Sequence, residues 1–214
     1  MDNQSSPTPS PQPDPLTKTA GGERKNVVLA ITGASGAIFG LRMLRMLLVN
    51  EFNVDLILSE YGQYNLFKEC NIDIRQPNAT ELFPDISTRS IIKMHSILDL
   101  KSEIFSVNYI VYGVIVCPCS MNFLSGIAHS ACKNLIEKAA DYAMSYSRPL
   151  IIVPRETPLN KIHLENMLKV IEAGGHILPA MPGFETNPQN FNDLADLIAA
   201  RVLNLLTGNR TMSV

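Results

Sequence analysis

Short runs of branched apolar residues alternate along the chain with longer segments in which apolar residues recur every three or four positions. The short runs are typical of buried strands and the longer segments of amphipathic helices. Their alternation predicts an α/β fold with crossover helices around a mostly parallel central sheet. The segment 71–98 lacks a clear period and contains Pro77 and Pro84, so we predict a long irregular excursion there. The predicted strands are 26–32, 54–58, 109–116, 150–153 and 176–181; the predicted helices are one with Ile38, Leu41, Leu44 and Leu48 on one face, then 61–70, 121–130, 133–146, 161–173 and 187–206.

Polar and special residues collect where the predicted strands end. Any one of these loops is also explained as a plain turn, since Gly, Ser and Pro end strands in many proteins. Four such loops together favour a ligand site, because ligands bind at the carboxyl edge of open α/β sheets. The four are Gly33 to Gly36, Ser59, Cys119-Ser120 and Arg155-Glu156.

The first of these loops, Thr32 to Gly36, joins a predicted strand to a predicted helix. Backbone N–H groups and a serine hydroxyl therefore converge at a helix N-terminus, which suits a phosphate. The glycines at 33, 36 and 40 do not have the spacing of the dinucleotide fingerprint, so the loop gives little support for NAD binding. A tight turn without a ligand is the alternative.

Four charged side chains could take part in chemistry. Arg155 and Glu156 are adjacent between two prolines, which indicates either a site or a structural ion pair at a subunit contact. Glu69 lies at the edge of an apolar helix face, where a carboxylate either points to solvent or transfers protons. Arg201 flanks the predicted inward stripe of the last helix and needs an anion, which could be a carboxylate, a carbonyl or a bound phosphate. That stripe is Leu194, Leu197, Ile198, Val202 and Leu205.

Composition bounds the domain and excludes several function classes. Five of the fourteen prolines fall at positions 7, 9, 11, 13 and 15, so we predict a disordered tail over 1–25. The rest fits one domain. The 18 basic residues against 20 acidic ones form no basic cluster, which argues against a nucleic-acid partner. The apolar runs are too short for a membrane span, and the four cysteines without a secretory signal favour the cytoplasm.

Histidine and cysteine spacings do not match a metal site, so we predict none. The four histidines are interpreted as structural or surface residues, and Cys117-Pro118-Cys119 as strand-end packing. The strand-edge loops therefore remain the candidate positions for a functional site.

Several long strings resemble the UbiX-type flavin prenyltransferases. They are ITGASGAIFGLR (31–42), CPCSM (117–121), NLIEKAAD (134–141), PLIIVPRETPL (149–159) and IHLENML (162–168). The resemblance covers 26–208 and leaves 209–214 as a short C-terminal tail. It implies a Rossmann-like three-layer flavoprotein fold and a homododecamer that holds FMN at subunit interfaces. It also implies transfer of a dimethylallyl group from dimethylallyl monophosphate to reduced FMN, whose prenylated product serves a UbiD-type decarboxylase.

The resemblance also assigns roles residue by residue. Catalytic roles fall on Glu69, Glu156 and Ser35, and substrate-phosphate binding falls on Arg155, Arg201 and the position of Glu185. The cofactor-binding positions are Gly33, Ala34, Ser35, Ser59, Ser120, Met121, Asn122, Phe123 and Lys138.

The chain departs from the family pattern mainly around the substrate phosphate. Lys138 replaces an arginine, Ser145 a phosphate-binding lysine, and Glu185 a phosphate-binding tyrosine. Two alternatives therefore stay open. One is a related FMN enzyme of the decarboxylase kind, for which His95 is the candidate catalytic histidine although it precedes Cys117 by more than the family pattern allows. The other is an FMN-binding protein or scaffold without prenyl transfer.

Overall fold

The computed structural model describes residues 24–74, 77–184 and 187–209. Six strands form one sheet in the order β3-β2-β1-β4-β5-β6, and every neighbouring pair is parallel. The predicted parallel α/β sheet is thus confirmed, and its strand order is that of a doubly wound Rossmann fold. The predicted tail 1–25 lies outside the described residues except for its last two. The strands are β1 Asn26–Ile31, β2 Asn53–Leu58, β3 Ile92–His95, β4 Val111–Cys119, β5 Leu150–Pro154 and β6 His176–Ile177.

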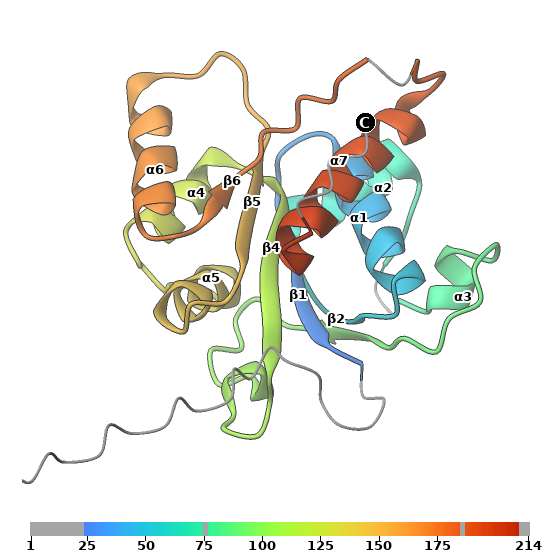
Figure 1. Cartoon of the computed structure of the whole chain (residues 1–214), viewed down its shortest axis with the longest axis horizontal. Coiled ribbons are helices and arrows are strands. Elements are labelled where there is room, and N and C mark those ends of the chain that lie inside the picture. Colours follow the sequence, from blue (N-terminus) through green and yellow to red (C-terminus); the bar gives the residue numbers. More distant parts are fainter. Residues whose placement is uncertain (1–23, 75–76, 185–186, 210–214) are drawn as a thin grey trace, which may run out of the picture.

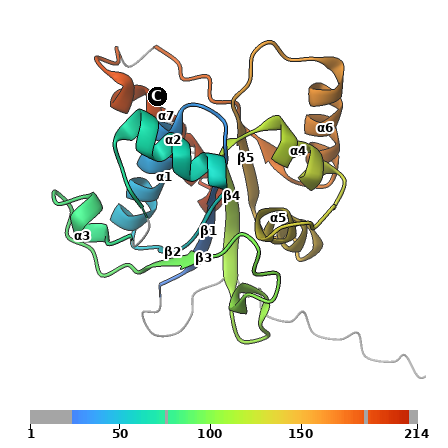
Figure 2. The same cartoon turned by 180° about the vertical axis from the view of Figure 1, so that it is seen from behind.

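Helices cover both faces of the sheet and make three layers (Figure 1; Figure 2, from behind). On one face lie α1 Ala37–Val49, α2 Glu60–Cys70 and α7 Phe191–Thr207; on the other lie α4 Met121–Ala128, α5 Leu135–Ser145 and α6 Lys161–Glu172. Alternate residues of β1 therefore enter different hydrophobic cores on the two faces of the sheet. Val27 and Leu29 belong to one core, and Val28 and Ala30 belong to the other. A strand that is buried on both faces is a continuous apolar run in the sequence. The sequence therefore predicted the position of β1 to within one residue.

The final helix α7 packs against α1, and a bidentate pair between Arg42 and Asp196 links them. This carboxylate raises the pKa of Arg42 further above its ordinary value. The buried stripe of α7 differs from the predicted one by a rotation of about one residue, and Arg201 is exposed on the outer side rather than beside the core. The stripe is Ala195, Ile198, Ala199, Val202 and Leu206.

The segment 71–98 is more regular than its sequence indicates. It contains the short helix α3 Ala79–Leu82 and the edge strand β3, which pairs with β2. A strand of four residues with only its last residue buried has too few apolar positions to show a period. At the opposite edge, regular pairing ends after Ile177, but Leu178 N and Ala180 N still donate to carbonyls of β5.

Candidate active site

The loops after β1 and β4 meet where the strand order reverses, because helices from these two neighbouring strands leave toward opposite faces. The side chain of Thr32 joins the two loops. Its hydroxyl donates to Pro118 O at 2.8 Å and accepts from Ser120 N at 2.8 Å. Thr32 is fully buried, so this link is a fixed part of the edge. Two of the strand-edge loops predicted from the sequence are thereby brought together.

Glu69 lies at the N-terminus of α1. Its Oε2 accepts from Gly36 N and from Ala37 N, each at 2.8 Å. Gly36 precedes α1 with φ of 94° and has no capping side chain of its own, so Glu69 supplies the missing acceptor. The sequence assigned these N–H groups to a ligand phosphate, but the chain's own carboxylate occupies them here.

The carbonyls of the β1–α1 loop (residues 32–36) face side-chain donors. Asn65 Nδ2 donates to Gly33 O and Ala34 O, each at 3.2 Å, and Arg155 Nε donates to Ser35 O at 2.7 Å. Within the described ranges, the N–H groups of residues 33 to 35 have no protein acceptor. Three consecutive donors are therefore available to an anion or to the carbonyl and nitrogen acceptors of a flavin ring. Sequence reasoning missed Asn65, whose signal is its place one turn before Glu69 on α2.

Arg155 and Glu156 line a cavity of about 440 Å³ beside this loop, together with Leu159, Ala180 and Met181. In the part of the chain that the structure describes, neither forms an ion pair, because Arg155 uses Nε for the loop carbonyl and Glu156 Oε1 accepts from Thr157 N at 2.9 Å. The single chain therefore leaves both side chains to a ligand or to the structural ion pair at a subunit contact that the sequence also allows.

The remaining serine candidates lie at helix starts on the same edge. The buried hydroxyl of Ser59 caps α2 by accepting from Gly62 N at 3.0 Å. Ser120 precedes α4, and its hydroxyl makes no capping bond. Met121 is buried, Phe123 is half-buried and Asn122 is exposed. Among the described residues, the hydroxyls of Ser120 and of the exposed Ser35 have no protein partner, so both could serve a ligand.

Three of the assigned residues do not join this edge within the described chain. Lys138 Nζ donates to Leu100 O at 2.6 Å and lies 4.5 Å from the centre of the Phe105 ring. Arg201 lines a separate cavity of about 500 Å³ with His176 and Leu178. Glu185 lies outside the described residues. Roles for all three residues stay predictions, and within one chain Lys138 and Arg201 lie away from the loops.

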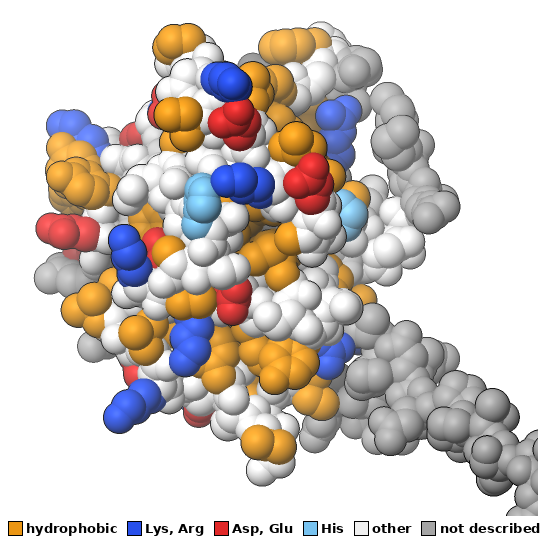
Figure 3. Space-filling view, turned by 90° about the vertical axis from the view of Figure 1, so that its left-hand side faces the viewer, with side chains coloured by type: hydrophobic (Ala, Val, Ile, Leu, Met, Phe, Trp, Pro, Cys, Tyr) orange, Lys and Arg blue, Asp and Glu red, His pale blue; other side chains and the backbone are white. Residues whose placement is uncertain are grey.

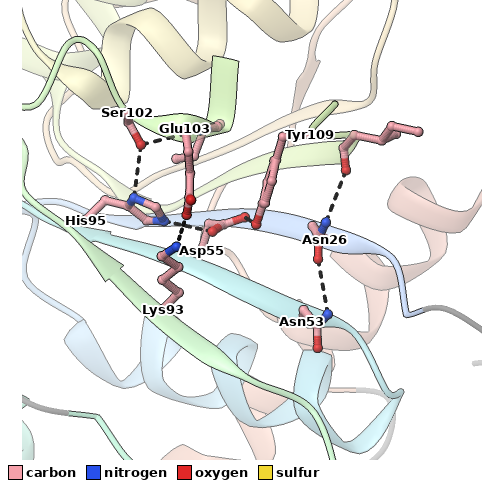
Figure 4. Close-up of polar contacts among 10 residues, drawn as sticks. Asn26, Asn53, Asp55, Lys93, His95, Ser102, Glu103 and Tyr109 are labelled. Carbon is pink, nitrogen blue, oxygen red and sulfur yellow. Dashed lines mark hydrogen bonds and ion pairs between the residues drawn. The ribbon is translucent and has the colours of Figure 1, made fainter. Parts of the chain in front are cut away.

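His95, the last residue of β3, belongs to a buried polar network with side chains of β2 and of the segment that follows β3 (Figure 4). Its Nε2 lies 2.7 Å from Asp55 Oδ1 and its Nδ1 lies 3.0 Å from Ser102 Oγ, while Tyr109 OH donates to Asp55 Oδ2 at 2.7 Å. Burial and this bond raise the pKa of Tyr109 well above its ordinary value. Both ring nitrogens of His95 have protein partners, so the candidate histidine of the decarboxylase alternative links the segment 96–110 to β2.

Replacing Tyr109 with phenylalanine is expected to lower the free energy of unfolding by about 1–3 kcal/mol, because a buried oxygen of Asp55 loses its donor. The raised pKa means that the wild-type contribution is complete below about pH 10, the ordinary value, and is lost as pH rises above it. Urea unfolding at pH 7 measures the loss, with Tyr64→Phe on the exposed face of α2 as the control. Equal stability of the two variants would contradict a structural role for the network.

Across residues 24–74, 77–184 and 187–209, no set of three or more His, Cys, Asp or Glu side chains is placed to hold a metal ion. No helix in these ranges is both long and apolar enough to cross a bilayer.

Comparison with known proteins identifies the family. The flavoprotein family profile matches residues 17–203. Flavin prenyltransferase UbiX of Alkalihalophilus pseudofirmus is 41% identical over 191 residues, covering 88% of this chain and 94% of the relative. Flavin prenyltransferase UbiX of Pseudomonas aeruginosa is 41% identical over 186 residues, covering 85% and 89%.

Solved structures agree with this result. AnUbiX (PadA1), determined in complex with FMN and dimethylallyl pyrophosphate, superposes with a TM-score of 0.75 at 33% identity, covering 87% of this chain and 95% of that one. A dodecameric FMN-dependent UbiX-like decarboxylase from Escherichia coli O157:H7 gives 0.70 at 31% identity, covering 84% and 92%. The chain belongs to the flavoprotein family, and within it to the UbiX-type flavin prenyltransferases.

Proposed function

We propose that this chain is an FMN-dependent prenyltransferase that moves a dimethylallyl group from dimethylallyl monophosphate to reduced FMN. The observation that carries the proposal is the β1–α1 loop, whose three free N–H groups lie beside the cavity of Arg155 and Glu156. The free donors fit a flavin, and the Arg155 guanidinium, which pairs with no carboxylate in the described ranges, fits a phosphate. Reduced FMN would supply the nucleophilic N5 and C6 positions, which would bond to the two ends of the allyl unit as the phosphate leaves.

The chain's own residues have separable tasks. The N–H groups of residues 33 to 35 and the segment Ser120 to Phe123 hold the flavin, with Ser59 at the end of β2. Arg155 holds the leaving phosphate, aided by the exposed Ser35 hydroxyl. Glu156, which lines the cavity and whose Oε1 accepts from Thr157 N, takes up a released proton. Glu69 acts on the same loop as the acceptor at the start of α1.

The site is completed between subunits of a homo-oligomer, which we propose to be a dodecamer. Lys138 and Arg201 do not reach the loops within one chain, and the E. coli relative is dodecameric. The outer face of α6 carries an apolar stripe, Leu164, Leu168 and Ile171, each a little over half exposed at 53%, 53% and 52%. Figure 3 shows the side of the molecule that carries α6, where hydrophobic side chains lie among charged ones.

Replacing Leu168 with glutamate is expected to break this assembly, because a subunit contact over the stripe would bury an unpaired carboxylate. Size-exclusion chromatography with light scattering should show a smaller particle, and prenyl transfer should fall with it. Glu172→Gln, at the exposed end of the same helix, is the matched control and should leave the particle unchanged. An unchanged mass for the Leu168 variant would place the contact elsewhere.

The proposed reaction is tested by mass spectrometry of the flavin after incubation with FMN, a reductant and dimethylallyl monophosphate. The expected product is FMN heavier by one prenyl unit, and Glu156→Gln should slow its formation. Dimethylallyl pyrophosphate is tested in parallel as a donor, because AnUbiX (PadA1) was determined in complex with it. FMN binding without any mass shift from either donor would favour the second candidate, a flavin-binding protein without prenyl transfer. Ser145, which stands where the family has a phosphate-binding lysine, supports that candidate.

The product would serve a UbiD-type decarboxylase in the cytoplasm. Restored activity of a cofactor-free decarboxylase on addition of the reaction mixture tests this partner.

A further inference from the structure

Asn65 is a half-buried amide on the inner side of α2, one helical turn before Glu69. Its Nδ2 lies 3.2 Å from Gly33 O and 3.2 Å from Ala34 O, so the two N–H bonds of one amide group serve two consecutive carbonyls. The two α2 side chains thus bond opposite ends of the β1–α1 loop. The amide of Asn65 donates to carbonyls near the start of the loop. The carboxylate of Glu69 accepts from the N–H groups where the loop enters α1.

The bonds made by Asn65 fix the direction of two particular peptide groups. A trans peptide points its C=O and its N–H in opposite directions. Holding Gly33 O therefore fixes the N–H of Ala34, and holding Ala34 O fixes the N–H of Ser35. These are two of the three N–H groups that have no acceptor among the described residues. The carbonyls that accept from Asn65 and the N–H groups left for a ligand thus belong to the same peptide groups.

The first of these peptides needs such a restraint. Glycine loses more conformational freedom on ordering than any other residue, and it allows backbone orientations that other residues do not. Rotation of the peptide between Gly33 and Ala34 would turn a carbonyl toward the ligand and replace a donor by an acceptor. The side chain of Asn65 opposes that rotation because the rotated carbonyl would lose its bond.

We propose that Asn65 is a positioning residue for the flavin, which keeps the N–H groups of Ala34 and Ser35 directed at the cofactor. This inference rests on one part of the proposed function, the binding of FMN. It does not depend on the prenyl donor. Asn65 acts through the loop and need not touch the flavin. The free N–H groups of the loop then favour acceptor atoms of the ligand, as a flavin ring offers and a cation does not.

Two substitutions separate this role from general support of the fold. Asn65→Ala removes the donor, and we expect the dissociation constant for FMN to rise about tenfold, as for the loss of two neutral hydrogen bonds. Asn65→Asp has nearly the same shape but places a carboxylate against two carbonyls and one turn from Glu69. Repulsion then weakens binding more than in the alanine variant when the new carboxylate is ionised.

The pH profile of the aspartate variant is the decisive measurement. The neighbouring Glu69 raises the pKa of an introduced Asp, and the protonated acid donates one bond to the loop. FMN affinity of Asn65→Asp should therefore recover several-fold between pH 8 and pH 5.5 relative to Asn65→Ala. The affinity is measured at both pH values on the same variant. A loss of stability that is equal at the two pH values therefore cannot produce the recovery.

The experiment is a titration of the cofactor-free full chain with oxidised FMN, followed by quenching of flavin fluorescence at pH 5.5 and pH 8. Gln63→Ala, on the same helix, is the control because its side chain makes no hydrogen bond within the described part of the chain. Wild-type affinity of Asn65→Ala, or an aspartate variant that follows the alanine variant at both pH values, would overturn the inference. No prenyl donor is present, so a chain that binds FMN but transfers nothing contradicts the proposed reaction and not the role of Asn65.

Discussion

Replacing Arg155 with alanine is expected to lower kcat/KM for prenyl transfer by about a thousandfold. Two contacts disappear together. The first is the 2.7 Å bond from Nε to Ser35 O, which holds the β1–α1 loop, and the second is the proposed charged contact to the substrate phosphate. A hydrogen bond from a charged group contributes about 1.5–3 kcal/mol, so two of them add to about 4 kcal/mol. Single-turnover rates with FMN and dimethylallyl monophosphate measure the loss.

Two further variants show which part of Arg155 matters. Arg155→Lys keeps the charge but loses the planar fork that serves a carbonyl and a phosphate at once, so an intermediate loss of about tenfold is expected. Lys161→Ala removes a nearby exposed cation that pairs with Glu165 at 3.4 Å, and it should leave the rate unchanged. An alanine variant at 155 that binds FMN and reacts within threefold of wild type would show that the phosphate binds elsewhere.

Replacing Gly62 with alanine is expected to lower the free energy of unfolding by about 3 kcal/mol or more, the upper range for an overpacked core. A Cβ at this position would lie 2.3 Å from Ile31 O and 2.9 Å from Ile31 C. Ile31 is fully buried at the end of a central strand, so its backbone cannot move aside. The added methyl would also lie 3.1 Å from Ser59 Oγ, the oxygen that caps α2. Urea unfolding of the cofactor-free chain measures the effect.

Gly174→Ala gives the matched control. Gly174 has a φ of +90° but nothing within 4 Å of the added Cβ, so only backbone strain of about 1–2 kcal/mol is expected. The comparison separates strain from the close approach of α2 to β1. Since α2 carries both Asn65 and Glu69, the Gly62 variant should also lose FMN affinity. Equal destabilisation of the two variants would show that α2 can move away from the strand.

The sequence predicted every strand of the described sheet except the edge strand β3, and it was most accurate for strands that are apolar on both faces. The runs at 26–32 and 150–153 correspond to β1 and β5 within one or two residues, because a buried strand is a local pattern. The edge strand β3 was missed, since its pairing with β2 decides its conformation. The stripe of α7 was misplaced by about one residue, because leucines at 194, 197 and 205 are compatible with a face that the packing on α1 turns partly outward.

The sequence by itself determined the fold class, the edge of the sheet that carries the site, and the family, since these depend on periodicity and on continuous strings of residues. Only the tertiary structure decided which groups serve one another at that edge. Asn65, Glu69 and Arg155 reach the β1–α1 loop from 31 to 120 positions away along the chain, and Lys138 and Arg201 do not reach it within one chain. The physical reason is that a hydrogen bond depends on positions in space, and strand order and helix packing set those positions independently of local sequence.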